Sequence, residues 1–462
     1  MNRSLLTLAL AALLVPAQAQ TQALDLLEAW QRAEQRAPEA AQARAAREAG
    51  VARGEQAKAL WRPQLLVEAG ASKATHETAM RGAQFSAPGF GQSQGVAFDT
   101  SVTGGTGTRT ALMLRQPLFS RERDAQAQAL GLSQSMAEAE WTQARQALML
   151  QVVEAYFAVG LAHERLRLVA QQQTAVDRAA AEARDRFQLG DRPITDVHEA
   201  TARAAALQAE RLAADSQIQV VRAALADLMG ALPADAAPRL PAANPRVPAG
   251  ALATWLQDAD QGNPGLQRAE LGVQVLQAQA RAVAGAALPT VDLVAQAARE
   301  RLSGSGDFGA ARNSATQGAI GVQVVLPLYT GGMRPALAHE AQARVSRAQA
   351  ERDRARQQVA QQTRAAWLDL AVGERQLAAL SAALEASRAR LDATRLGLQA
   401  GDRTLLDLLR AENDAAAAEL ALLEARTRLI TSRLHLSALA GQLDEGALQQ
   451  ARALLPPVPQ PQ

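Results

Sequence analysis

The spacing of apolar and polar positions along the 462-residue chain predicts very long helices that two strand regions interrupt. Residues 120–189 and 335–400 are rich in Ala, Leu, Gln, Glu and Arg and poor in Gly and Pro, which is typical of long helices. At ~1.5 Å per residue each would reach about 100 Å. Because such helices cannot bury a face within one globule, we expect them to pack along the helical segments 23–59, 195–228, 251–287 and 405–439.

Strand patterns are confined to two regions. In residues 317–328 the apolar side chains of Ile320, Val322 and Val324 share one face, and this period of two predicts a half-buried strand. Residues 110–118 show the same pattern more weakly, and further strands are expected after Pro63 and Pro289. The segments 82–108 and 303–317, rich in Gly, Ser and Thr, are expected to be loops. A strand of about ten residues is long enough to cross a bilayer when tilted.

The chain contains the same plan twice. Pro38 and Pro63 recur 226 positions later as Pro264 and Pro289, and the segments LRQPLFS and VVLPLYT match further along. We therefore divide the chain into a first copy at 20–240, a second copy at 241–445 and a C-terminal tail at 446–462 that we expect to be disordered. Residues 1–19 have the charged start, apolar stretch and A-x-A site of a secretory signal peptide, and no later apolar run is long enough for a membrane helix.

Composition narrows the function classes. The chain is 48% hydrophobic but only 3% aromatic, has no cysteine, and carries a net charge of +2 without a basic block. Disulfide scaffolds and thiol chemistry are excluded, and nucleic acid is not an expected partner. The five histidines lie at wide spacing, and no nucleophile elbow, phosphate loop or metal-ligand motif is present. We expect no enzyme activity, no cofactor and no metal.

In the order of its elements the chain resembles the TolC-like outer-membrane efflux protein family. The segments that carry the resemblance are AYFAVGLAHERL, RDRFQLGDRPITDV, VVLPLYTGGMRPAL, LQAGDRTLLDLL and SRLHLSALAG. The resemblance implies a mainly α fold with a small β part: a trimeric α-barrel of long coiled helices, continuous with a 12-stranded outer-membrane β-barrel to which each subunit gives four strands. Four strands alone cannot close a barrel, and an open edge in lipid leaves backbone groups unpaired, so such strands require oligomerisation.

The function implied by the resemblance is that of an exit duct. Such a homotrimer in the cell outer membrane, with its helices in the periplasm, passes substrates of a tripartite efflux or type I secretion system. Its partners are a periplasmic adaptor, an inner-membrane pump and outer-membrane lipid. An exported periplasmic coiled-coil adaptor or structural protein without a pore is the alternative, but it does not explain the two strand pairs or the duplication.

The resemblance also points to a gate at the turns that precede the returning helices. Arg403 takes the family's Arg position and Asp407 its first acid, whereas Arg410 replaces the second acid and Leu398 replaces a tyrosine. Asp196 matches the acid that pairs with that tyrosine. The alternative for Asp407 and Arg410 is an ordinary i,i+3 ion pair on a helix surface.

Adaptor docking is implied at the same two turns, at Gly190, Asp191, Arg192, Gly401 and Asp402. The two glycines are expected to adopt positive φ at the helix ends, and Thr195 or Thr404 is expected to cap a returning helix. Phe119 and Tyr329, at the predicted strand ends, belong either to an aromatic girdle or to packing where strands meet helices.

Overall fold

The computed structural model describes residues 23–89, 91–191, 193–233, 236–306 and 309–457. These form two compact units: unit 1 comprises the described parts of 1–46, 139–267 and 354–462, and unit 2 comprises 47–138 and 268–353. The predicted signal peptide lies outside the described residues. Among the described residues, no helix is both long and apolar enough to cross a membrane.

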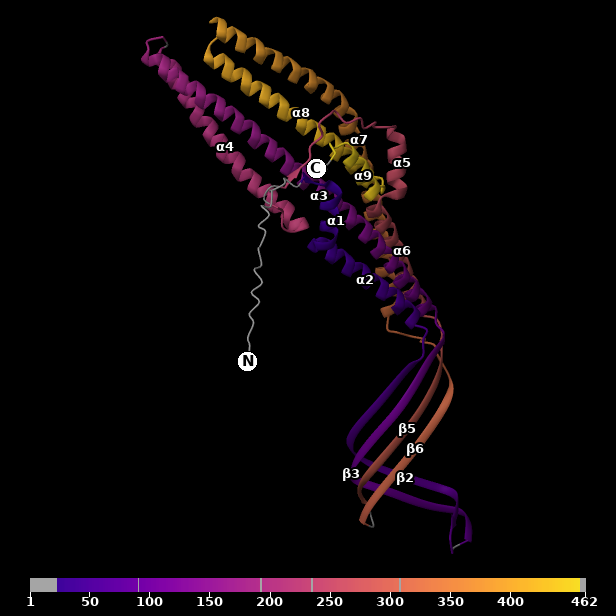
Figure 1. Ribbon diagram of the computed structural model, residues 1–462. Helices are drawn as coiled ribbons and strands as arrows, with labels where there is room; N and C mark the ends of the chain where they lie inside the picture. The colour runs from indigo at the N-terminus through magenta and orange to yellow at the C-terminus, as the bar shows by residue number, and fades with distance from the viewer. Residues whose placement is uncertain (1–22, 90, 192, 234–235, 307–308, 458–462) are drawn as a thin grey trace, which may run out of the picture. The chain divides into compact units, whose positions relative to one another are not determined.

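The two long helices predicted from composition are confirmed. Helix α3 (Arg121–Gln188) and helix α7 (Met333–Ala400) each contain 68 residues. Each is followed after a short turn by a returning helix of about half that length, α4 (Ile194–Met229) and α8 (Leu405–Leu439) (Figure 1). The resulting helical hairpins α3–α4 and α7–α8 dominate unit 1.

The helical segments expected at 23–59 and 251–287 are each divided into two helices. The first contains α1 (Leu26–Arg36) and α2 (Pro38–Ala59), and the second contains α5 (Leu252–Gly262) and α6 (Pro264–Gly285). Proline disfavours the helical conformation in the residue before it, and Ala37 and Asn263 are accordingly extended, with ψ of 132° and 119°. The expectation of continuous helical segments was therefore wrong at Pro38 and Pro264.

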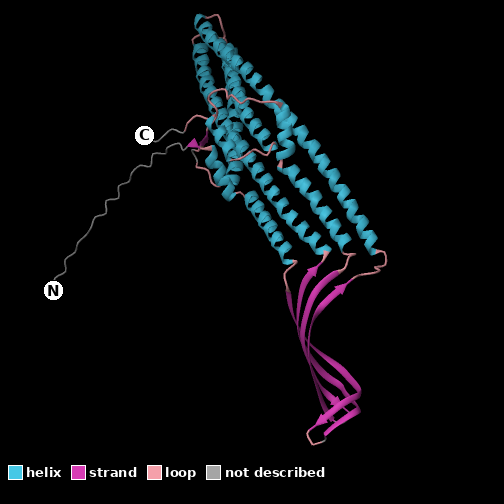
Figure 2. Ribbon diagram, turned by 90° about the vertical axis from the view of Figure 1, so that its right-hand side faces the viewer, coloured by secondary structure: helices cyan, strands magenta, loops and turns pink. Residues whose placement is uncertain are grey.

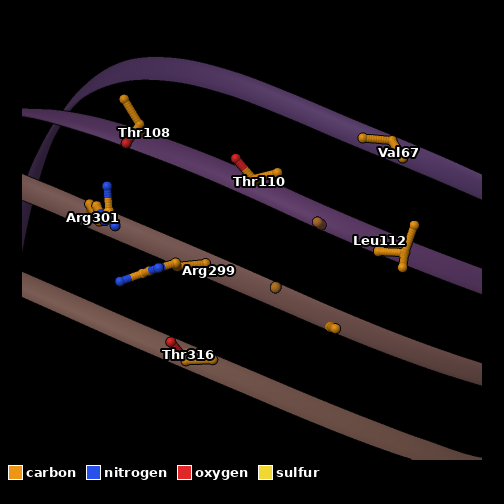
Figure 3. A pocket seen from close by; sticks show the side chains of 10 residues that line it. Val67, Thr108, Thr110, Leu112, Arg299, Arg301 and Thr316 are labelled. Carbon is orange, nitrogen blue, oxygen red and sulfur yellow. The ribbon is translucent and has the colours of Figure 1, made fainter.

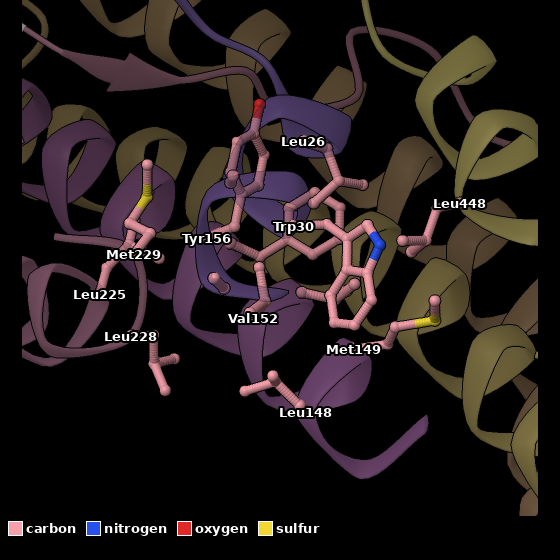
Figure 4. Close-up of a cluster of buried hydrophobic side chains, with 14 of the residues drawn as sticks. Leu26, Trp30, Leu148, Met149, Val152, Tyr156, Leu225, Leu228, Met229 and Leu448 are labelled. Carbon is pink, nitrogen blue, oxygen red and sulfur yellow. The ribbon is translucent and has the colours of Figure 1, made fainter. Parts of the chain in front are cut away.

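The main apolar core of unit 1 gathers α1, α3, α4 and the C-terminal helix α9 (Glu445–Ala453) (Figure 4). Trp30 of α1, Met149 of α3 and Leu448 of α9 are almost completely buried there. Tyr156 lies at the edge of this core, where its hydroxyl donates to the Leu24 carbonyl at 2.8 Å and accepts from the Arg239 amide at 2.9 Å. These bonds attach the short parallel pair β1 (Ala23–Leu24) and β4 (Ala237–Pro238) to α3.

Helix α9 corrects the expectation that the whole segment 446–462 is disordered. The Asp444 carboxylate caps the helix by accepting from the Ala447 amide at 2.9 Å. Leu448, Ala451 and Leu455 point one apolar face into the core, which gives this short segment enough buried surface to fold. Residues 458–462 lie outside the described part of the chain.

Unit 2 contains a four-stranded antiparallel sheet in the order β2-β3-β5-β6 (Figure 2). Its strands are β2 (Gln64–Ala87), β3 (Gly91–Phe119), β5 (Thr290–Gly306) and β6 (Gly309–Val325). The central pair joins one strand from each copy of the repeated plan. Asp292 of β5, with its side chain only 3% exposed, binds Arg115 of β3 at 2.5 Å and Arg123 of α3 at 3.6 Å, which ties this pair to the start of α3.

The strands are much longer than the sequence pattern predicted. The segments 82–108 and 303–317, expected to be loops, belong almost entirely to the two β-hairpins. Gly82 and Gly104 adopt positive φ beside shifts in the strand register, which lets the ribbon bend without ending. These parts of the strands lack regular apolar alternation, so their period of two was not visible in the sequence.

Candidate functional site

The turns between the paired helices have the same backbone design. Gly190 and Gly401 adopt φ of 81° and 85°, as predicted. The amide of Asp191 donates to the Arg186 carbonyl at 2.9 Å, and that of Asp402 donates to the Gly397 carbonyl at 2.8 Å. This bond from the second residue beyond the helix back to its last turn is the Schellman motif, which ends a helix sharply. Arg192 lies outside the described residues.

The second turn is more tightly fixed than the first. Thr404 caps α8 as predicted: its hydroxyl accepts from the Asp407 amide at 3.1 Å, while the Asp407 carboxylate accepts from the Thr404 amide at 3.0 Å. Helix α4 instead begins after Pro193 without a side-chain cap, and Thr195 lies inside the helix. The expected cap at Thr195 was therefore wrong, and the capping box belongs to the second copy alone.

The capping box determines the state of Asp407. Hydrogen bonds donated by the Thr404 amide and hydroxyl lower the pKa of the Asp407 carboxyl, and the charges of Arg403 and Arg410 act in the same direction. The Asp407 carboxylate is thus hydrogen-bonded to Thr404 at the start of α8. The positive charge of Arg410 helps to keep this carboxylate ionised. Arg403 folds back beside Gly397, where an added Cβ would come within 2.6 Å of the arginine side chain.

Asp196 lies beside the second turn. It is half-buried and lines two small pockets of about 260 and 240 Å³ between the hairpins α3–α4 and α7–α8. Leu398 lines the larger pocket and Thr404 the smaller one. The structure thus brings together the matched positions Asp196 and Leu398, although leucine offers no hydrogen-bond donor.

Contacts farther along the helices link the two hairpins. Glu419 of α8 accepts from Arg167 of α3, in the other hairpin, at 3.1 Å, and from Arg388 of α7, in its own hairpin, at 2.9 Å. Arg203 of α4 donates to Asn413 of α8 at 2.7 Å. These contacts are not predictable from the sequence, because their partners lie on different helices and no local spacing of residues indicates them.

The sheet of unit 2 has two chemically different faces. The register places Leu65 beside Leu114, Ala295 and Ile320, and Val67 beside Leu112, Ala297 and Gly318. This apolar face remains open to solvent in the single chain; Leu65, Val67 and Ile320 are 66%, 66% and 77% exposed. The opposite face carries polar residues such as Glu68, Gln296 and Gln323. One apolar and one polar face, alternating along each strand, is the pattern of strands that separate lipid from a water-filled interior.

The aromatic residues at the strand ends are exposed. Phe119 is 43% and Tyr329 88% exposed. The guanidinium of Arg121 lies 5.9 Å from the centre of the Phe119 ring. The exposure of Tyr329 suits an aromatic girdle, whereas the contact of Phe119 with the first residue of α3 is packing at the junction.

Within the described residues, no three His, Asp or Glu side chains gather in a way that suits a metal ion. His163 lies 3.3 Å from Arg222, and burial, with a smaller contribution from that charge, lowers the pKa of its imidazole. The other histidines are dispersed over separate elements.

Comparison with known proteins agrees with this architecture. Residues 29–231 and 255–442 match the family model described as outer membrane efflux protein. The chain is 28% identical over 319 residues to the outer membrane efflux protein BepC of Brucella suis, covering 68% of this chain and 66% of BepC. It is 28% identical over 305 residues to the proteases secretion protein PrtF of Dickeya chrysanthemi, covering 65% of each. The matched region thus spans slightly less than two thirds of either relative.

A solved structure shares the fold over nearly the entire chain. The Campylobacter jejuni CmeC outer membrane channel superposes with a TM-score of 0.72 at 15% identity, covering 99% of this chain and 98% of that one.

Proposed function

The chain belongs to the outer membrane efflux protein family, and from this premise we propose that it is the outer-membrane exit duct of a tripartite efflux or type I secretion system. The family is one of transport channels and not of enzymes. In this role the protein passes substrates outward and needs an interior, an entrance and a docking surface instead of a catalytic group.

The sheet of unit 2 is the observation that carries the proposal. Its outer strands, β2 and β6, each have one long edge without a strand partner among the described residues, and its apolar face is open. In lipid, each backbone N–H or C=O group that is left unpaired along a strand edge costs on the order of several kcal/mol, as does any other unsatisfied polar group. Edge-to-edge pairing of β6 with β2 of the next copy would close three subunits into one twelve-stranded barrel.

Helices α3, α4, α7 and α8 would then form the periplasmic part of the same duct. Three hairpin pairs arranged around one axis enclose a channel that continues the barrel. We place the entrance at the turns, where Arg403, Asp407, Arg410 and Asp196 of three subunits would form rings of charge. Charged rings set the selectivity of a pore.

The capping box supports a specific arrangement of these rings. Because Asp407 is held against Thr404, its carboxylate lies at the helix start with little freedom, and the exposed Arg410 side chain follows three residues later on the same helix face. With Arg410 where the resemblance expects a second acid on the same helix, this entrance would favour cations less than one that carries an acid at position 410.

The turns also form the proposed docking surface. Gly190, Asp191, Arg192, Gly401 and Asp402 would contact the periplasmic adaptor, which connects the duct to an inner-membrane pump. The Schellman geometry of both turns gives the adaptor two similar, sharply ended helix tips to recognise.

Planar-bilayer recording tests the proposal. The purified protein is expected to run as a trimer and to give discrete single-channel currents. Arg410→Asp is expected to shift selectivity toward cations, whereas Arg53→Asp, an exposed arginine of α2, serves as the charge-matched control. A monomer that gives no current would refute the duct, and selectivity unchanged by Arg410→Asp would remove Arg410 from the entrance.

A further inference from the structure

Cations collect on the apolar face of the sheet, just beyond its apolar rows. A row is defined here as the four residues that the register places side by side on β2, β3, β5 and β6. Beyond the row that contains Val67, the next three rows are Ala69, Thr110, Arg299 and Thr316; then Ala71, Thr108, Arg301 and Ser314; then Lys73, Thr106, Ser303 and Arg312. These twelve positions hold four cations and no acid, and we call them the cationic belt.

The cationic belt is unpaired and open. All of its charged residues are exposed, and none forms an ion pair with any residue that the structure describes. They are Lys73, Arg299, Arg301 and Arg312. Figure 3 shows Arg299 and Arg301 beside Thr108, Thr110 and Thr316. These five residues line an open pocket of about 580 Å³ on the sheet. Guanidinium groups only donate hydrogen bonds, and the neighbouring hydroxyl groups can donate as well. With no carboxylate among them to compete, these donors suit an oxyanion such as phosphate.

The opposite face at the same level is different. There the register places Arg109 directly beside Glu300, so the cation is matched by an acid. Leu302 is 5% exposed on that face, whereas its neighbours Arg301 and Ser303 on the belt face are exposed. The excess of positive charge therefore belongs to the outward, open face and not to the interior face.

The position of the belt along the strand agrees with the edge of a bilayer. From Val291, at the start of β5, to Arg301 the strand advances ten residues, or about 33 Å at ~3.3 Å per residue. A strand tilted by about 40° rises about 25 Å over that length, which is the height of the apolar band in outer-membrane barrels. Arg301 thus lies at the band's outer limit, and Arg299 is close enough to extend its guanidinium there.

We propose that the cationic belt binds the phosphate groups of anionic lipid headgroups in the outer leaflet of the membrane that the barrel spans. This inference rests on the proposed function, which puts the apolar face in lipid and the far ends of the strands outside. The phosphorylated saccharolipid of that leaflet is the occupant that the charge and the neighbouring apolar rows fit: its phosphates meet the guanidinium and hydroxyl donors, and its acyl chains lie on the rows of Val67 and Leu65. Arginine binds phosphate through two parallel hydrogen bonds, which fixes the headgroup as well as attracting it.

Native mass spectrometry of the trimer from lipid nanodiscs tests the inference. The probe lipids, each diluted in phosphatidylcholine, are lipid A with both phosphates and the same lipid with its phosphates removed. The wild type is expected to retain phosphorylated lipid A, and Arg299→Gln/Arg301→Gln is expected to retain about tenfold less, because two charge-assisted contacts are lost. Arg109→Gln, which removes a cation of the same sheet from the opposite face, is expected to retain as much as the wild type.

Three results would overturn the inference. They are equal retention by the wild type and the double variant, equal retention of the dephosphorylated lipid, and displacement of the bound lipid by millimolar inorganic phosphate, which would indicate a simple anion site. Single-channel currents recorded for the same samples separate this inference from the proposed function. A wild type that conducts but fails the retention test refutes the belt alone, whereas a protein that does not conduct refutes the duct.

Discussion

The hydroxyl of Tyr156 offers a sharp test of how unit 1 is held together. Tyr156 is completely buried, and its hydroxyl bonds to Leu24, near the start of the described residues, and to Arg239, at the end of the first copy. Tyr156→Phe removes both bonds and keeps the ring. The buried Leu24 carbonyl left without a partner costs about 1–3 kcal/mol, and the part-buried Arg239 amide adds about 1 kcal/mol, so we expect a loss of about 2–4 kcal/mol in local stability.

Hydrogen–deuterium exchange on the purified trimer measures this loss where it occurs. A local destabilisation of about 2 kcal/mol corresponds to about 30-fold faster exchange, which we expect at Leu24 and Arg239. Tyr329→Phe is the matched control, because the only other tyrosine is 88% exposed and has no hydrogen bond to any described residue. Equal exchange in the two variants would show that the Tyr156 hydroxyl does not hold these segments.

The effect of pH on this difference follows from the same geometry. Burial raises the pKa of the Tyr156 hydroxyl above its ordinary value, and the bonds and charge of Arg239 only partly offset this. A group whose pKa is raised on folding contributes its full stability below its unfolded pKa of about 10 and loses it as pH rises through the folded value. The gap between the wild type and Tyr156→Phe is therefore expected to stay constant from about pH 6 to 9.

Two further predictions concern the helical hairpins. Thr404→Ala is expected to destabilise the start of α8 by about 1 kcal/mol and to speed hydrogen–deuterium exchange in its first turn. Thr195→Ala, at a position with no cap bond, is expected to leave exchange in α4 unchanged. Equal changes of exchange in the two variants would refute the assignment of Thr404 as the cap. Glu419→Gln removes the charge from two partly exposed ion pairs, of which only the pair with Arg167 crosses between the hairpins. We therefore expect it to weaken the link between the hairpins by about 0.2–1 kcal/mol and to raise single-channel conductance. Glu340→Gln, which removes the charge from an ion pair with Arg344 inside α7, is the control, and conductance unaltered by Glu419→Gln would contradict the link.

The elements that the sequence predicted well are those whose evidence is local. Composition and the absence of helix breakers located α3 and α7, and glycines followed by Asp-Arg located both turns with their positive φ. Thr404 was recognisable as a cap because its partner Asp407 lies three residues later. Each of these features is decided by residues within one or two helical turns.

The features that the sequence did not reveal depend on distant partners or on solvent. The strands run on through 82–108 because backbone pairing with the neighbouring strand continues where side-chain alternation stops. Helix α9 folds because Leu448 packs into the core formed by α1 and α3. The cationic belt is equally hidden, since Lys73 and Arg312 are far apart in the chain and only the register shows that they share a row.

The duplicated plan leads to unequal chemistry, and this inequality identifies the parts that function needs. Both turns share one backbone, yet only the second has a capping box, at Thr404 and Asp407. Both β-hairpins belong to one sheet, yet three of the four cations in the cationic belt, all except Lys73, come from β5 and β6. If only the backbone structure mattered, the capping box and the three cations could lie in either copy. Apart from Asp196 at the entrance and Lys73 in the belt, the second copy therefore carries the charged residues that we assign to the entrance and to the lipid surface, while the first supplies the matching strands and helices that complete the wall.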